Sequence, residues 1–365
     1  MAWFRPTLES LIKRNQADIE SSIDGVDAKV RRKNLNIIAK MVSALAHGLY
    51  GNLAYNVKQI FHDTADTENL RRHASLWLDV PLKEASYAVG PVVLLGTNGV
   101  LVEADTVLIR ADGVEYSTDA EATISAGQAV VNVTALTPGQ TSNAVAGTVL
   151  SLASPIAGIN GSATVDAAAL TGGADEESDI SLSNRVGMRI KNPPHGGANH
   201  DYIAWALEVS GVTRAWVYPQ ELGGGTVTVR FVRDDDASLI PDAAEVLVVQ
   251  NHIDDSRPTT ADVSVVAPIA SPLDFTLSVT PNTDAVKAAV ISELTDLLRR
   301  ESIPAGTIPA NLIPKGVIPG KLLISHIREA ISLAAGETNY NMTSPVADVE
   351  VTTGHMITLG NFTWL

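Results

Sequence analysis

Cysteine is absent from this chain of 365 residues, and its absence excludes several chemistries at once. Without thiols there is no disulfide, no cysteine nucleophile, no iron–sulfur cluster and no cysteine-ligated zinc site. Long apolar runs are lacking too, since no stretch approaches the roughly 18 to 20 residues that span a bilayer. The opening MAWFRPTLESLIKRN has no signal-peptide core or cleavage site. We therefore expect a soluble protein, made in a reducing cytoplasm, without membrane insertion.

Positive charge is scarce in the middle of the chain. Residues 87–184 hold one Lys or Arg against 11 Asp or Glu, a net charge of −10 within a total of −15. Such a region repels phosphate backbones, so we expect no nucleic-acid partner outside the N-terminal helices. The basic triplet Arg31-Arg32-Lys33 is interpreted as a solvated or ion-paired helix face.

Motifs that carry chemistry are lacking as well. His195 and His200 stand five apart across a Pro-Gly break and match no metal-binding spacing. Asp234-Asp235-Asp236 lacks the alternating ligands of a calcium loop, so we interpret it as a solvated acidic turn. Gly223-Gly224-Gly225 precedes a strand and lacks the Lys-Ser/Thr of a phosphate loop. The sequence thus predicts no catalytic residue, no cofactor and no metal site.

Helical periodicity dominates the N-terminal region, residues 1–86. We expect a short helix up to Ile23, a turn at Asp24-Gly25, and a helix over residues 27–61 that reaches roughly 50 Å at ~1.5 Å per residue. An apolar stripe recurs along it every three or four residues at Ile38, Met41, Leu45, Leu49, Leu53, Val57 and Ile60. The stripe is typical of a helix that packs against a partner subunit, with folding back onto its own domain as the alternative.

The next region, residues 87–171, reads as an acidic β-rich domain. Short runs rich in Val, Thr and Ile alternate with turn residues, which predicts a sandwich or a partly open barrel. The expected strands cover residues 91–95, 107–110, 114–117, 130–135 and 147–152.

Residues 172–211 form a linker block of glycine turns and two helices. Gly172 and Gly173 end a strand, and Asp175 opens an acidic run where a helix start favours negative charge. That helix runs through Leu182, Val186 and Ile190 and contains Arg185. After the break at Gly196 and Gly197, a second helix begins near Asp201, carries Tyr202 and Trp205, and stops at Gly211.

The C-terminal half predicts α+β structure. Residues 212–302 alternate strand pairs with helices over 241–255 and 283–301, in a split βαβ manner, with Pro241 and Thr283 at the helix starts. Residues 303–365 open with Ile-Pro repeats, interpreted either as an arm across a neighbouring surface or as a loop on its own domain. A helix over 320–335 and a strand-like tail follow. The aromatic end, Phe362-Thr363-Trp364, is expected to be docked.

In the order of these elements the chain resembles the baseplate J-like family, the wedge proteins of contractile-tailed phages of the Mu-like and P2-like type. Where the family usually has a second arginine just before the position of Arg185, this chain has Ser183-Asn184. The resemblance is carried by Gly172, Gly173, Asp175, Leu182, Arg185, Gly196, Gly197, Asp201, Tyr202, Trp205, Ala206, Gly211, Val212, Val227 and Val229.

The resemblance implies a structural protein in the tail baseplate of a virion, assembled in the host cytoplasm. Its partners would be a second copy of itself, a smaller wedge protein, and neighbouring baseplate, hub and sheath-initiating proteins. It would join a ring around the tail hub that rearranges to trigger sheath contraction. The residues of interest are then structural: the glycines and aromatic anchors named above, with Ile38, Leu45, Leu49 and Leu53 of the stripe.

Two other functions stay open at this point. A tail-tip or surface carbohydrate-binding module would need exposed aromatic residues on the strands, and only Tyr87 and Tyr116 fall in that region. A hydrolase with a histidine or carboxylate centre finds no motif to support it. Asp201 and Tyr202 could form a carbohydrate-handling pair, but a helix-start Asp and a core Tyr explain both.

Overall fold

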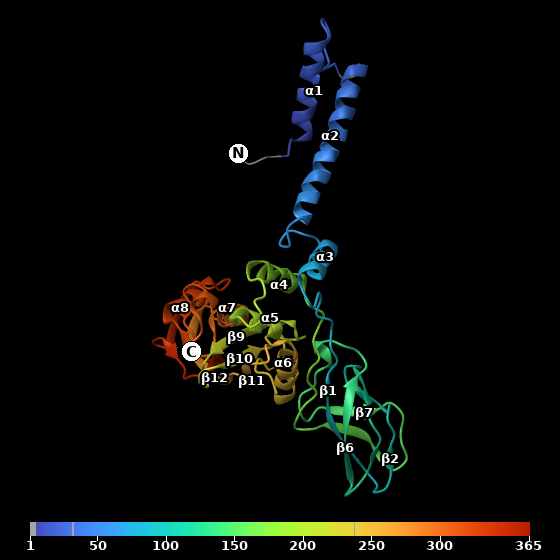
Figure 1. Ribbon diagram of the computed structural model, residues 1–365, viewed down its shortest axis with the longest axis vertical. Coiled ribbons are helices and arrows are strands. Elements are labelled where there is room, and N and C mark those ends of the chain that lie inside the picture. Colours follow the sequence, from blue (N-terminus) through green and yellow to red (C-terminus); the bar gives the residue numbers. More distant parts are fainter. Residues whose placement is uncertain (1–4, 31–32, 237) are drawn as a thin grey trace. The chain divides into compact units, whose positions relative to one another are not determined.

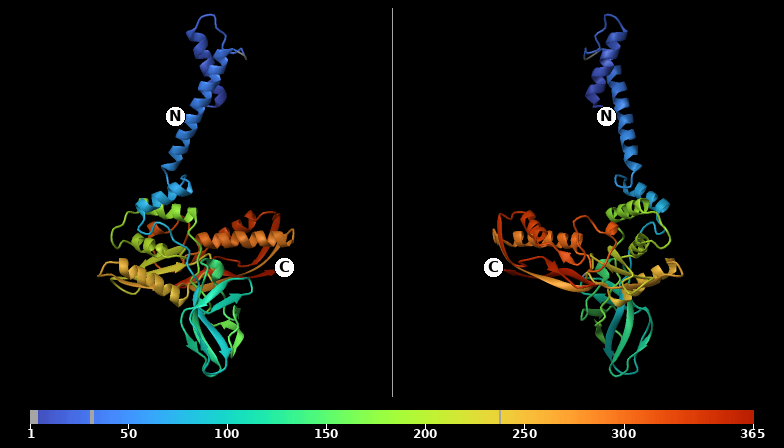
Figure 2. Two further views of the ribbon diagram at one scale, coloured as in Figure 1. Left: turned by 90° about the vertical axis from the view of Figure 1, so that its right-hand side faces the viewer. Right: turned by 60° about the vertical axis from the view of Figure 1, so that its left-hand side comes forward.

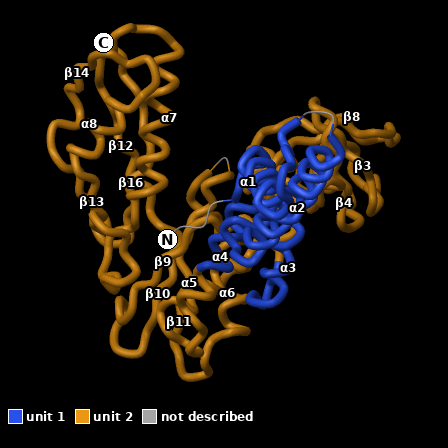
Figure 3. The backbone as a smooth tube through the Cα atoms, turned by 90° about the horizontal axis from the view of Figure 1, so that it is seen from above, with its two compact units in different colours: residues 1–81, 178–187 blue, residues 82–177, 188–365 orange. Residues whose placement is uncertain are grey.

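The computed structural model describes residues 5–30, 33–236 and 238–365. They form two compact units, drawn in blue and orange in Figure 3: residues 1–81 with 178–187, and residues 82–177 with 188–365. The expected fold class is confirmed, with N-terminal helices, a β-barrel in the middle and a C-terminal α+β region.

The first unit holds α1 (Leu8–Ser22), α2 (Asn34–Gln59), α3 (Thr67–Trp77) and most of α4 (Asp179–Lys191). The long helix starts at Asn34 rather than at residue 27, so its 26 residues span about 39 Å, not 50 Å. Residues 27–30 are not helical, and the Asn36 side chain donates to the Ala28 carbonyl among them. Arg31 and Arg32 lie outside the described residues, and Lys33 occupies the N-cap position before the helix rather than lying on its face.

Small residues bring α1 and α2 together side by side (Figure 2). Ala39 and Ser43 of α2 are buried, and Asn15 of α1 donates to the Ser43 hydroxyl at 2.8 Å. Short side chains let the two backbones approach, so this seam uses only one face of α2.

The second unit begins with a closed barrel in the order β1-β6-β4-β3-β7-β8. A short pair, β2 (Leu101–Val102) with β5 (Ala122–Thr123), lies outside it. Closure by β8 was not expected, because its Asn160-Gly161-Ser162 reads as a turn. The barrel strands are β1 (Val89–Gly96), β3 (Val107–Arg110), β4 (Glu115–Thr118), β6 (Gln128–Ala135), β7 (Val149–Leu152) and β8 (Ile159–Val165).

The segments that lead into and out of the barrel run together. Ser86 pairs with Ala174, and Val89 pairs with Thr171, in isolated antiparallel bridges. The 3-10 turn η1 (Gln140–Ser142) lies against the outgoing segment through Asp175, which accepts from the Gln140 amide.

Two three-stranded sheets follow (Figure 1). The central sheet has the order β11-β10-β9, with β9 (Arg214–Pro219) antiparallel and β11 (Asp262–Val266) parallel to β10 (Thr226–Val232). Its core includes residues of α5 (Asn199–Glu208) and α6 (Ala243–Ser256). The cap of α6 is Asp242, whose side chain accepts from the Glu245 amide, so Pro241 precedes the cap and the expected proline start is wrong.

The C-terminal sheet has the order β14-β12-β16 and packs against α7 (Asp284–Glu301) and α8 (Ile324–Leu333). Thr283 caps α7, as expected. The tail is docked, since Phe362 stacks between Phe275 and Trp364 at centroid distances of 5.2 and 5.6 Å. The sheet strands are β12 (Ile269–Thr280), β14 (Asn339–Ser344) and β16 (His355–Trp364), with a small pair β13 (Lys321–Leu322) and β15 (Val349–Glu350) beside them.

The Ile-Pro repeats pack on their own chain. Ile303 and Ile308 are buried in a cluster with Trp216 and Tyr218 of the central sheet, and the Tyr218 hydroxyl donates to the Pro304 carbonyl at 2.6 Å. A 3-10 turn, η2 (Ala310–Leu312), interrupts the segment. Of the two interpretations, the structure favours the loop over the arm.

Candidate functional site

Helix α2 exposes the apolar stripe expected from the sequence. The exposed fractions are 50% for Ile38, 68% for Leu45, 59% for Leu49 and 57% for Leu53. Successive residues of a helix turn by about 100°, so these side chains project roughly a third of the way around from the Ala39–Ser43 seam. The stripe is therefore a second face of α2 that α1 leaves uncovered.

Gly172, Gly173 and Asp175 lie at the outgoing end of the barrel. Gly172 has φ of +87° and Gly173 exchanges two hydrogen bonds with the Asn143 side chain. A Cβ at Gly173 would lie 2.4 Å from the Ser142 hydroxyl, so no larger residue fits without displacement. Asp175 bonds to the η1 turn, whereas α4 begins at Asp179, the last residue of the acidic run.

Gly196, Gly197 and Asp201 build the turn before α5. Both glycines have positive φ, and a Cβ at Gly197 would meet the Pro258 ring at 2.8 Å. The Asp201 carboxylate is buried and accepts from the amides of His195, Gly197 and Ala198. It organises the turn and has no surface left for a ligand role.

Tyr202 and Trp205 meet edge to face on α5, with ring centroids 5.1 Å apart. Tyr202 is buried in the core of the central sheet, and burial raises the pKa of its hydroxyl. Arg185, on α4 in the other unit, is buried and donates to the Val80 carbonyl at 2.6 Å. These residues fix backbone and packing, each within its own domain.

Gly211 opens space for an arginine. A Cβ there would lie 2.2 Å from the guanidinium of Arg233, and the φ of +81° also favours glycine. Arg233 donates to the Ser210 carbonyl and pairs with Asp236 at 2.5 Å and Glu245 at 3.1 Å. Burial raises the pKa of both carboxyls, against the lowering effect of Arg233.

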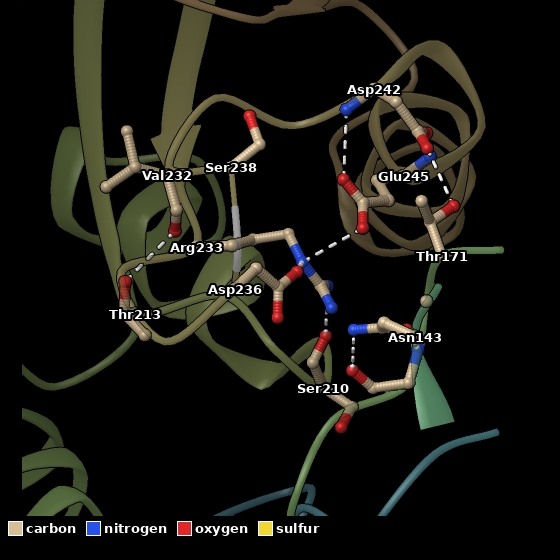
Figure 4. A network of polar contacts seen from close by, with 12 residues as sticks. Asn143, Thr171, Ser210, Thr213, Val232, Arg233, Asp236, Ser238, Asp242 and Glu245 are labelled. Atoms are coloured by element: carbon tan, nitrogen blue, oxygen red, sulfur yellow. Dashed lines mark hydrogen bonds and ion pairs between the residues drawn. The ribbon is translucent and has the colours of Figure 1, made fainter. Parts of the chain in front are cut away.

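The same network connects the barrel to the central sheet (Figure 4). Thr171, on the outgoing barrel segment, donates to Asp242 at 2.7 Å, and Asp242 exchanges hydrogen bonds with Glu245 in the α6 cap. Neither the role of Arg233 nor the Thr171–Asp242 bond was predicted from the sequence. Only the glycine at 211 could have signalled that a bulky group approaches there.

The acidic run after β10 is a turn in which only the Asp235 side chain, 68% exposed, is solvated, so the sequence interpretation is corrected for Asp234 and Asp236. Asp234 is largely buried and forms a two-bond pair with Arg214 at 2.7 and 2.8 Å. Asp235 pairs with Arg299 at 2.6 Å, and Asp236 with Arg233. Arg214 and Arg299 lie 20 and 64 residues from their aspartates, so local charge counting could not reveal them.

The described residues contain no group of three or more His, Cys, Asp or Glu side chains that could hold a metal ion. His195 and His200 touch edge to face, and the His200 ring bonds to the Pro193 carbonyl. Within the same described ranges, none of the helices has the length and apolar character needed to cross a membrane.

Three family models match consecutive parts of the chain. The baseplate J-like protein barrel domain covers residues 91–173, the central domain 194–267 and the C-terminal domain 273–365. A curated relative, baseplate protein gp47 of Escherichia phage Mu, is 32% identical over an alignment of 376 residues that covers all of both chains. The chain belongs to the baseplate J-like protein family. The resemblance seen in the sequence is thereby confirmed.

Two further comparisons concern the whole length of this baseplate J-like chain. Mu-like prophage FluMu protein gp47 of Haemophilus influenzae is 32% identical over 376 aligned residues, with full coverage of both. Among solved structures, a chain of the six-fold symmetrised baseplate of the anti-feeding prophage aligns over 98% of this chain and 100% of its own. Its TM-score is 0.42, with 10% identity.

Proposed function

We propose that this chain is a structural wedge subunit of a contractile phage-tail baseplate. The observation that carries the proposal is its relation, over the full length of both chains, to the Mu baseplate protein gp47. The site geometry agrees with a role without catalysis, since the residues singled out above set turns, cap helices or fill cores. Its place in the virion would be the tail baseplate.

The stripe on α2 is the surface through which we expect the subunit to assemble. Burying a Leu or Ile side chain contributes about 1.5–3 kcal/mol, so Ile38, Leu45, Leu49 and Leu53 together can hold a neighbouring helix. The occupant in this proposal is a second copy of the chain or the smaller wedge protein, with hub and sheath-initiating proteins joining the completed ring.

The proposed mechanism is a change of arrangement between subunits. Opening of the wedge ring would release the sheath to contract, which requires interfaces with two stable packings. A helix face of flexible Leu and Met side chains can repack between two partners' grooves without breaking hydrogen bonds.

The test is the doubly substituted chain Leu45→Gln, Leu49→Gln. We expect it to fold normally, because both side chains are exposed, but to lose association with itself or with the neighbouring baseplate proteins in light scattering and to yield no complete tails. Lys40→Gln, an exposed α2 change off the stripe, is the control. Tails assembled from the double variant at the normal yield would refute the proposal.

The carbohydrate-binding alternative loses most of its aromatic surface. Tyr116 is buried inside the barrel and its hydroxyl donates to the Ser142 carbonyl at 2.8 Å. Tyr87 is then the exposed aromatic residue of the predicted β-rich domain. A single ring makes a poor sugar platform.

A further inference from the structure

The outer surface of the barrel carries a row of β-branched side chains. Val93 of β1 lies opposite Val130 of β6 on one side and Thr164 of β8 on the other, and Thr164 lies opposite Val149 of β7. Residues directly across a ladder point to the same face. Val92 and Leu94 are buried in the barrel core, so this row points outward.

We call this surface the valine face and define it as Pro91, Val93, Leu95, Val130, Val149 and Thr164. Val130 and Val149 are 53% and 58% exposed. Around them the outward positions of the same four strands are uncharged: Gln128, Asn132, Thr134, Ser151, Asn160 and Ser162. Asp119, which accepts from Thr134, and Asp166, whose amide donates to Pro91, border the face.

The uncharged character stands out because residues 87–184 carry a net charge of −10. Their one cation, Arg110, is bonded to Asp112 and to the Thr141 and Asn143 carbonyls. A basic partner would be drawn to the acidic part of the barrel, away from the valine face. An acidic partner is repelled least at the uncharged valine face. To pack against this face, the partner must itself have an uncharged surface at the contact.

A second copy of this chain meets both conditions. We propose that the valine face packs against the valine face of another copy, sheet on sheet, at the spacing of about 10 Å usual for such layers. A two-fold axis along the strands, between Val93 and Thr164, places Val130 of each copy against Val149 of the other. The contact is separate from the α2 stripe and does not rest on the baseplate role.

The test uses the full chain with Leu45→Gln and Leu49→Gln, so that self-association through the stripe is removed. Sedimentation velocity at increasing protein concentration should still show a monomer–dimer equilibrium. Between about 0.05 and 0.5 M NaCl the Debye length falls about threefold, so the dimer should strengthen with salt as acidic repulsion is screened. A chain that stays monomeric under all these conditions, or a dimer that weakens with salt, overturns the proposal.

Adding Val130→Lys should raise the dimer Kd at least about tenfold, because it places a charge in the contact. The matched control is Val248→Lys on α6, at 55% exposure against 53%, and it should leave the Kd unchanged. Equal effects from both substitutions contradict the assignment of the contact to this face.

The two-fold arrangement has its own test. Val130→Lys and Val149→Glu chains should each dimerise weakly alone, yet associate when mixed, since the lysine of one copy meets the glutamate of the other. Recovery on mixing supports the proposed register, and no recovery overturns it.

Discussion

Gly211 leaves its side-chain position to the guanidinium of Arg233, so a side chain at this position is opposed both by that group and by the φ of +81°. We expect Gly211→Val to lower the free energy of unfolding by about 1–3 kcal/mol or more, from backbone strain and displacement of Arg233. Urea unfolding followed by tryptophan fluorescence measures the loss. Gly224→Ala, with open space around it, should change stability by no more than about 0.5 kcal/mol. Equal losses from the two variants would count against this account.

Glu245 and Asp236 should give stability an unusual pH dependence. Burial raises the pKa of both carboxyls above their ordinary values of 4.5 and 3.8, so the folded chain holds these protons more tightly than the unfolded chain. Their contribution to stability is fully present below those ordinary values and is lost as pH rises through the raised pKa values. Glu245→Gln should therefore make the urea midpoint of unfolding depend less steeply on pH above 4.5. An unchanged slope would contradict the assignment.

At the scale of elements, α5 depends on its aromatic pair. Tyr202→Ala should cost about 3–5 kcal/mol by emptying space in the central core, and we expect it to block incorporation into tails. Gly196→Val should do so more weakly, because its Cβ finds open space and only the φ of +71° opposes it. Thermal unfolding and tail yield are the readouts, with no enzymatic rate involved. Infectious particles at normal yield from Tyr202→Ala would contradict the prediction.

Sequence periodicity predicted the helix and strand faces whose burial follows from residues close together in the chain. The α2 stripe and the strands with alternating valines were found because burial on one face leaves a local pattern. Strand β8 was not predicted, since Asn160-Gly161-Ser162 has the composition of a turn. Pairing with β1 and β7 holds the strand in the barrel. The start of α2 was also misplaced, because Ala28 is held outside the helix by hydrogen bonds to the Asn36 and Glu20 side chains, which the periodic pattern does not show.

The ion pairs of Asp234 and Asp235 could not be predicted, for a different reason. The partners of Asp234 and Asp235 are Arg214 and Arg299, which lie 20 and 64 residues away. Charge-pair partners at such separations leave no periodic signal in one sequence. The turn residues Gly172, Gly173, Gly196 and Gly197 were recognisable as turns, but the groups that crowd Gly173 and Gly197 appear only in the folded chain.

At the scale of the whole molecule, the barrel is inserted between two segments of the chain that pair with each other. The amides and carbonyls of Ser86 and Ala174 bond to each other, at 2.9 and 3.3 Å, so the segments that enter and leave the barrel are already joined where the barrel begins. A short Gly-Ser linker from Ser86 to Ala174 should therefore replace the barrel and leave the central and C-terminal sheets folded. Circular dichroism and hydrogen exchange of β10 and β12 would report this, and loss of protection there would contradict it.

The neighbouring position of these two segments also bears on how such chains change in evolution. A domain that leaves and re-enters at one point can be exchanged for another of different size, provided that its ends meet a few ångströms apart. The bridge between Ser86 and Ala174 brings the two ends of the barrel together in this way. The surface that the barrel presents can thus diversify while the helices and sheets beyond it keep their geometry.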